Sequence, residues 1–112
     1  MTALLDLAAR VERLSEPSEA VFEEAFWAVN PNYADPRRFR ELLDAKAWLD
    51  AALTLVPERL FPRLYCELAQ AILVAWTDTV GWEEMSRSAI CHTPALALTA
   101  AVLRAQAAQV QA

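Results

Sequence analysis

The chain has 112 residues, of which 56% are hydrophobic and 22% charged, and this composition fits one folded domain and excludes a disordered chain. Its formal net charge of −5 argues against binding to nucleic acid or to an anionic membrane through overall electrostatics. The longest apolar run, "AILVAW" at residues 71–76, is far below the ~20 residues that span a bilayer, and "MTALLDLAAR" lacks the basic start of a signal peptide, so we expect a cytoplasmic protein.

Residues 1–35 predict an acidic helical part, with seven acidic and two basic side chains. Leucine and valine recur at helical spacing over residues 3–14, with Thr2 as the expected N-cap. A second helix is expected over residues 17–29, with Pro17 in its first turn.

The sequence "NPNYADP" at residues 30–36 is the strongest break in the chain. The next helix is expected over residues 45–56, with Asp44 as its N-cap and Pro57 after its end. Whether residues 37–43 join this helix or form a separate turn is open. Its apolar stripe places Trp48, Leu53 and Val56 in the core.

Residues 60–77 fit two structures. A period of two aligns Ile72, Val74 and Trp76 on one face of a strand, whereas a period of 3.6 aligns Leu64, Leu68 and Ile72 on a helix. Trp76 is a core candidate in the strand reading. No glycine or asparagine marks a tight hairpin turn at residues 69–70, which counts against strands. After a turn at Gly81, "SRSAICH" at residues 86–92 is strand-like.

A last helix is expected over residues 94–110. Thr93 is its expected N-cap and Pro94 its first residue, which gives a sharp start. Leu96 and Leu103 lie on its apolar stripe and should be deeply buried. Its many alanines have high helix propensity and also let a helix lie close to a packed surface.

Two segments carry a family resemblance. "LLDAKAWLDAALTLVPE" is followed some forty residues later by "TPALALTAAVLRAQAA", and together they resemble the small phage and prophage proteins of the phage ABA-sandwich domain family. The resemblance implies an α/β/α sandwich and favours strands over residues 64–77. The family has no established chemistry, so the resemblance implies no catalytic residue.

The expected fold is therefore α+β, with a small antiparallel sheet over residues 63–91 packed between helices. An all-α bundle is the alternative. The whole chain, residues 1–112, is expected to be one domain, in which residues 36–112 hold a helix, the short sheet and the C-terminal helix.

Catalytic and metal-binding patterns are weak. His92 is the one histidine, Cys66 and Cys91 lie far apart in the sequence, and no CxxC or HxxxH spacing occurs. Adjacent Cys91 and His92 would point to opposite faces of a strand and could not act as nucleophile and base. We therefore expect no enzyme, no cofactor and no metal, and reduced cysteines in the core.

The expected function is that of a small non-enzymatic phage or prophage protein that binds another macromolecule, for instance an inhibitor of a host defence system such as an anti-CRISPR. The expected partner is a host or phage protein, for instance one with a basic surface, and neither nucleic acid nor membrane. The candidate contact residues are Glu19, Glu23 and Glu24 on the acidic helix, and Trp82, Glu83 and Glu84 in a predicted loop.

The alternative function is a self-associating structural or packaging protein of a phage particle, a homo-oligomer whose alanine-rich last helix packs on a copy of itself. The arginines of "PRRFR", residues 36–40, are expected to form salt bridges with the acidic helices and not to bind phosphate.

Overall fold

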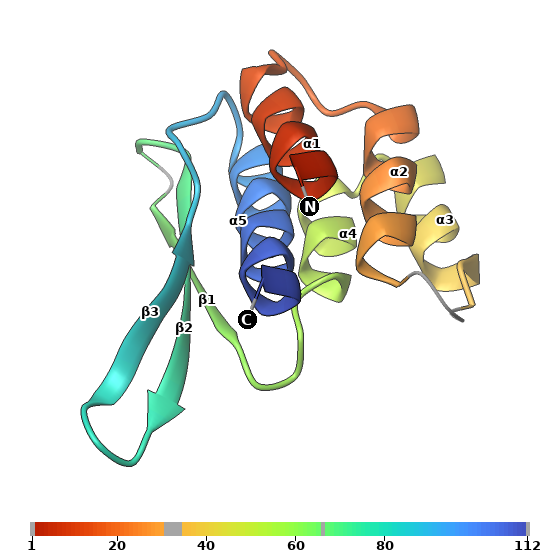
Figure 1. Ribbon diagram of the computed structural model, residues 1–112. Coiled ribbons are helices and arrows are strands. Elements are labelled where there is room, and N and C mark those ends of the chain that lie inside the picture. Colours follow the sequence, from red (N-terminus) through yellow and green to blue (C-terminus); the bar gives the residue numbers. More distant parts are fainter. Residues whose placement is uncertain (1, 31–34, 66, 112) are drawn as a thin grey trace.

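A computed structural model describes residues 2–30, 35–65 and 67–111. Helices and a three-stranded antiparallel sheet with the order β1-β2-β3 make up these residues (Figure 1). The helices are α1 (Thr2–Arg13), α2 (Glu19–Val29), α3 (Arg37–Asp44), α4 (Trp48–Thr54) and α5 (Pro94–Gln111). The strands are β1 (Phe61–Tyr65), β2 (Gln70–Thr77) and β3 (Gly81–Arg87).

Helix α5 is the centre of the molecule. It lies between the sheet on one side and α1, α2 and α4 on the others, so it is covered on all sides over most of its length, while Ala108 and Gln109 near its end are exposed (Figure 1). Leu96, Leu98 and Leu103 are fully buried, as are most of the alanines between them. A helix that is apolar all round is typical of a core position, and its alanines let neighbouring elements approach closely. The predicted burial of Leu96 and Leu103 is confirmed.

The N-terminus of α5 is capped as its sequence predicts. The backbone N–H of Leu96 donates to the hydroxyl of Thr93 at 3.2 Å, and Pro94 is the first helical residue. The alanine-rich face proposed for self-association is, however, not available. Because α1, α4 and the sheet already cover this face, a second copy of the chain has no access to it.

The helical segments before the sheet differ from expectation in three places. Helix α2 begins at Glu19 and not at Pro17, because Ser18 is its N-cap and accepts from the N–H of Val21. The expected helix over 45–56 is only α4, and Asp44 is the last residue of α3 rather than an N-cap. Thr2 lies within α1, not before it.

The separation of α3 from α4 has a clear backbone cause. Lys46 adopts φ +57°, the N–H of Ala47 donates to the carbonyl of Leu42, and the N–H of Lys46 donates to that of Leu43. These two bonds form a Schellman motif, which ends a helix with a left-handed residue. Glycine usually occupies that position, so a lysine there gives no sequence signal for a helix end.

The α+β class and the antiparallel sheet are confirmed over residues 61–87. Ala69 lies at φ 46° between β1 and β2, so the connection takes a left-handed residue without glycine or asparagine, which is why the sequence lacked a turn signal. Gly81 has φ +77° and follows a turn in which Thr77 accepts from the N–H of Val80 and donates to the carbonyl of Gly81. "SRSAICH" is strand only as far as Arg87.

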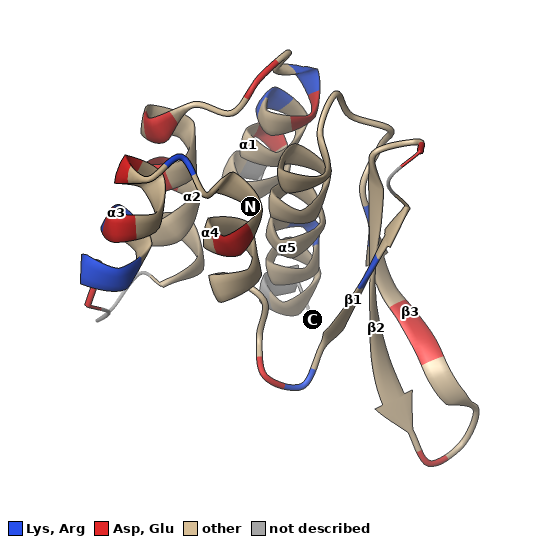
Figure 2. Ribbon diagram, turned by 180° about the vertical axis from the view of Figure 1, so that it is seen from behind, with Lys and Arg blue, Asp and Glu red and all other residues tan. Residues whose placement is uncertain are grey.

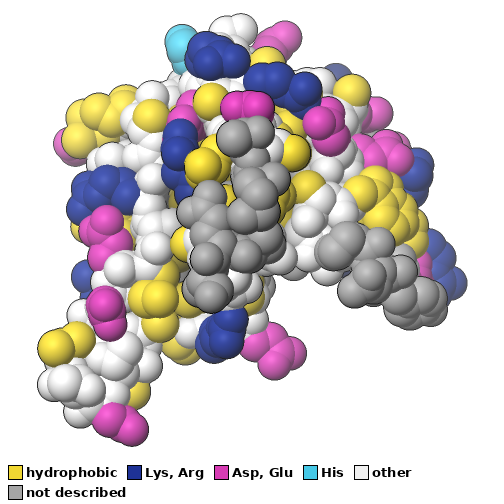
Figure 3. Space-filling view, viewed as in Figure 1, with side chains coloured by type: hydrophobic (Ala, Val, Ile, Leu, Met, Phe, Trp, Pro, Cys, Tyr) yellow, Lys and Arg dark blue, Asp and Glu magenta, His cyan; other side chains and the backbone are white. Residues whose placement is uncertain are grey.

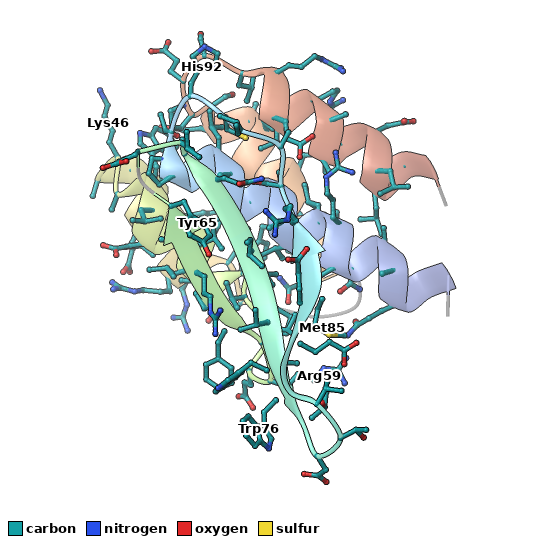
Figure 4. All side chains as sticks on the ribbon, turned by 90° about the vertical axis from the view of Figure 1, so that its left-hand side faces the viewer. Lys46, Arg59, Tyr65, Trp76, Met85 and His92 are labelled. Atoms are coloured by element: carbon teal, nitrogen blue, oxygen red, sulfur yellow. The ribbon has the colours of Figure 1, made fainter. Side chains whose placement is uncertain are left out.

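The sheet is covered on one face. Ala71 and Leu73 of β2 pack on α5, and Ser86 of β3 donates to the carbonyl of Ala101. In the part of the chain that the structure describes, no helix lies on the other face (Figure 4). The sheet is thus packed against helices and not between them, and the second helical layer of an α/β/α sandwich does not come from these residues.

Two predicted core positions are wrong. Leu53 is 40% exposed, because α4 turns Ala51 and Ala52 inward. Trp76 is 61% exposed, because it lies on the uncovered face of β2. Val56 was expected to be deeply buried like Leu96, but it is only partly buried against the core. Trp48 is also partly buried, and its ring meets that of Phe22 edge to face at 5.4 Å.

Glu12 joins three parts of the molecule. Its carboxylate accepts from the guanidinium of Arg104 on α5 at 2.5 and 2.9 Å and from the N–H of Ala89, in the segment after β3, at 2.8 Å. Burial acts to raise the pKa of Glu12, but these hydrogen bonds outweigh it and leave the pKa below its ordinary value. Glu12 therefore connects α1 to α5 and to the segment that follows β3.

Candidate functional site

The uncovered face of the sheet is the most unusual surface of the molecule, and we call it the outer face. Strand register assigns its members, since residues opposite one another in a sheet share a face. They are Phe61, Arg63, Tyr65, Gln70, Ile72, Val74, Trp76, Trp82, Glu84 and Arg87. In Figure 4 this face is toward the viewer, with Tyr65 and Trp76 at opposite ends and the helices behind.

Three aromatic rings form a cluster at the hairpin end of the outer face. The ring of Trp82 meets those of Phe61 at 5.2 Å and Trp76 at 5.4 Å, both edge to face. Phe61 of β1 and Trp82 of β3 lie on either side of β2, and each is 49% exposed. The rings therefore support one another and leave a broad apolar surface in solvent, a feature associated with binding sites.

Strand β3 carries a bulge that changes which side chains face outward. The register shifts between Leu73 and Val74 of β2, so that Met85 is the extra residue of β3. Residues three apart in a regular strand point to opposite faces, but the bulge puts Glu84 and Arg87 on the same one. Their side chains form an ion pair at 2.7 Å, which lowers the pKa of Glu84.

Both edges of the sheet resist pairing with a further strand. Strand β1 is only five residues long and includes Pro62, which has no N–H to donate. On the other edge, β3 has its bulge at Met85. Short strands, edge prolines and bulges are the usual protections against added strands. Binding to this sheet is therefore expected on its face and not along its edges.

The acidic candidates on α2 lie far from the outer face. Figure 2 shows the acidic residues of α2 and of β3 on opposite sides of the molecule, with α5 between them. Glu23 pairs with Arg40 at 2.5 Å and Glu24 with Arg10 at 2.6 Å, whereas Glu19 is exposed with no ion pair among the described residues. The prediction that the arginines of residues 36–40 pair with the acidic helices is confirmed only for Arg40, because Arg37 pairs with Asp35 and Arg38 with Glu41.

The other three candidates lie in a strand and not in a loop. Trp82 and Glu84 belong to the outer face, while Glu83 pairs with Ala75 and so points to the other side. All three are exposed. In Figure 3 the end of the hairpin projects from the helical body, and hydrophobic and acidic side chains lie next to each other on it.

The surroundings of Cys91 and His92 do not activate either side chain. Burial raises the pKa of the Cys91 thiol to about 11, and the negative charge of Glu12 acts in the same direction. A thiol with that pKa stays protonated at neutral pH and is a poor nucleophile. His92 is exposed in the segment just before α5. Cys66 lies outside the described residues.

Among the residues the structure describes, no group of three or more histidine, cysteine, aspartate or glutamate side chains could hold a metal ion. A cavity of 410 Å³ near the start of α5 includes Lys46 and Asp50, and one of 350 Å³ between α5 and the sheet includes Arg59. Apolar side chains make up most of both walls. None of the described helices is long and apolar enough to cross a membrane.

Several residues of the outer face escaped sequence reasoning, namely Phe61, Arg63, Tyr65 and Arg87. The one sequence feature that points to the outer face is the near-continuous apolar run of β2, "AILVAW". A strand that is apolar on both faces is usually buried on both faces. A search for cover on each side would have identified the outer face.

Comparison of this chain with protein families, with curated proteins and with solved structures finds no match. The resemblance to the phage ABA-sandwich domain family accordingly stays a prediction. The choice of the outer face as the candidate site depends on the geometry of this chain alone.

Proposed function

We propose that this chain is a small non-enzymatic protein of phage origin that acts by binding another protein through the outer face of its sheet. The observation that carries the proposal is the aromatic cluster of Phe61, Trp76 and Trp82, which is half exposed on a face that no described helix covers. Tryptophan and other aromatic residues dominate the energetics of protein interfaces. The phage origin rests on the family resemblance alone.

The outer face supports this role better than the acidic helix does. Two of the three acidic candidates on α2 have arginine partners within the chain, as Glu84 has on the outer face, so acidic charge does not distinguish the two surfaces, whereas the exposed aromatic cluster does. The aromatic cluster has no such internal partner beyond its own rings among the described residues. A host or phage protein, including a component of a host defence system, is the expected partner class.

The proposal is tested by capture from a lysate of the bacterial host with three baits. These are the wild-type chain, the double variant Trp76→Ala with Trp82→Ala, and the control Trp27→Ala, which removes an exposed tryptophan from α2. We expect one protein to bind the wild type and the Trp27 control and to be lost with the outer-face variant. Equal capture by all three baits, or capture by none, would contradict the proposal.

A self-associating structural or packaging protein is the second candidate. One observation favours it, namely the arrangement of charges across the outer face, which is complementary to a second copy of the same face.

A further inference from the structure

We infer that two copies of this chain pair through their outer faces, with the strands of one sheet antiparallel to those of the other. The inference rests on the proposed function in using the outer face as the binding surface, and it commits to a second copy of the chain as the occupant, with which another partner protein would compete. It is carried by the order of side chains across the three strands.

Two neighbouring rows cross the centre of the outer face. The first row runs from Phe61 on β1 through Val74 on β2 to Glu84 on β3. The second row runs through Arg63, Ile72 and Arg87 in the same order. One row therefore holds an aromatic ring and a carboxylate where the other holds two guanidinium groups.

A twofold axis that crosses the strands between these rows brings the first row of one copy over the second row of the other. Phe61 then faces the second copy's Arg63, and Glu84 faces the second copy's Arg87. Arginine over an aromatic ring is attractive, as is the pair of opposite charges. Val74 and Ile72, each 5% exposed, lie beneath these side chains, so the side chains of β1 and β3 make the contact between the copies.

The other twofold arrangement is unfavourable. An axis parallel to the strands lays β3 of one copy over β1 of the other, so Arg87 faces the second copy's Arg63. Like charges that meet across an interface cost free energy. The bulge is essential to the favourable arrangement, because without it Glu84 and Arg87 would not share the outer face.

The exposed area suggests a weak dimer. An aromatic side chain has 150–250 Å² to bury, and Phe61, Tyr65, Trp76 and Trp82 are each about half exposed, so together they offer about 400 Å². A stable interface buries about 800 Å² on each partner. We therefore expect a dissociation constant in the micromolar range, with monomer and dimer in equilibrium.

The test is sedimentation equilibrium of the full chain from micromolar to millimolar concentration. Glu84→Arg should raise the dissociation constant at least about tenfold, because the new arginine faces the second copy's Arg87. Arg87→Glu should do the same. The double variant, Glu84→Arg with Arg87→Glu, should restore the dimer, and an equal mixture of the two single variants should form a heterodimer.

The matched control is Glu41→Arg on α3. Like Glu84, Glu41 pairs with an arginine three residues away, Arg38, on an exposed surface. Glu41→Arg should leave the dissociation constant unchanged. Circular dichroism of each variant checks the fold, and recovery of the dimer in the mixture also shows that both single variants are folded.

Two results would overturn the inference. A wild-type chain that stays monomeric at millimolar concentration has no such dimer, and the proposed function still stands if capture depends on the outer face. A wild-type dimer that Glu84→Arg leaves intact must use another surface of the chain.

Discussion

Both faces of β2 are apolar at their centre, but they have different neighbours. Ala71 and Leu73 point inward and pack on α5, while Ile72 and Val74 point outward beneath the larger side chains of β1 and β3. The inner residues include small ones because a helix approaches closely there. The outward-pointing residue nearest the end of β2 is Trp76, which is exposed to solvent. Apolar residues along a strand thus indicate that a face is buried in the functional state. They do not show whether the residues that bury it belong to the same chain.

The inner face should be the more sensitive to truncation. Leu73 is fully buried, so Leu73→Ala should lower the free energy of unfolding by about 2–5 kcal/mol through lost contacts and a cavity against α5. Urea denaturation measures the change. The control is Leu68→Ala, at an exposed leucine before β2, which should cost under about 0.5 kcal/mol. Similar costs at both positions would mean that α5 does not seal the inner face.

Glu12 of α1 binds Arg104 of α5 and the segment after β3, and it makes stability depend on pH. Glu12→Gln should cost about 1–3 kcal/mol at neutral pH, because Arg104 and the N–H of Ala89 lose a charged acceptor. The folded-state pKa of Glu12 lies below its ordinary value of 4.5, so its contribution is full above that pH and is lost as the pH falls through the folded pKa. Urea denaturation between neutral and acidic pH should show the difference between wild type and variant shrink in acid. A difference that persists undiminished in acid would rule out this ion pair as its source.

The start of α5 offers a smaller test of the same central element. Thr93→Ala should cost about 1 kcal/mol, since the N–H of Leu96 loses its acceptor. Thr79→Ala, in the exposed turn between β2 and β3, is the control and should be nearly silent. Thermal unfolding distinguishes them, and equal shifts for the two variants would count against a cap at Thr93.

The outer face should be the least sensitive to truncation. Trp76→Ala should change the free energy of unfolding by less than about 1 kcal/mol, because most of the ring is already in solvent. The measurement is made in the Glu84→Arg background, so that self-association does not add to the apparent stability. A loss as large as that of Leu73→Ala would mean that the aromatic cluster belongs to the core of the monomer.

The same difference between faces explains what the sequence could predict. Helices α1 and α5 were predicted to within a residue or two, because their apolar residues repeat at helical spacing. These residues, for example Leu7 in α1 and Leu103 in α5, are buried by other parts of the same chain. The end of α3 was missed because Lys46 takes a left-handed conformation that glycine usually marks.

The candidate site was predicted only in part. Trp82 and Glu84 were named, but as a loop, and Trp76 was assigned to the core. Period two identifies the side chains that share a face of a strand and does not say which face the rest of the chain covers. Phe61 and Arg87 reach the same surface only through the strand register and the bulge at Met85.

The central position of α5 has a consequence for synthesis. A ribosome delivers α1 to α4 and all three strands before residues 94–111, and each of them packs on that helix or on elements that do. The earlier segments therefore emerge with their apolar faces unmatched, and native packing waits for the helix that comes latest among those described. During that interval β2 and β3 expose both of their faces, so nascent copies of the chain are at their most prone to aggregation.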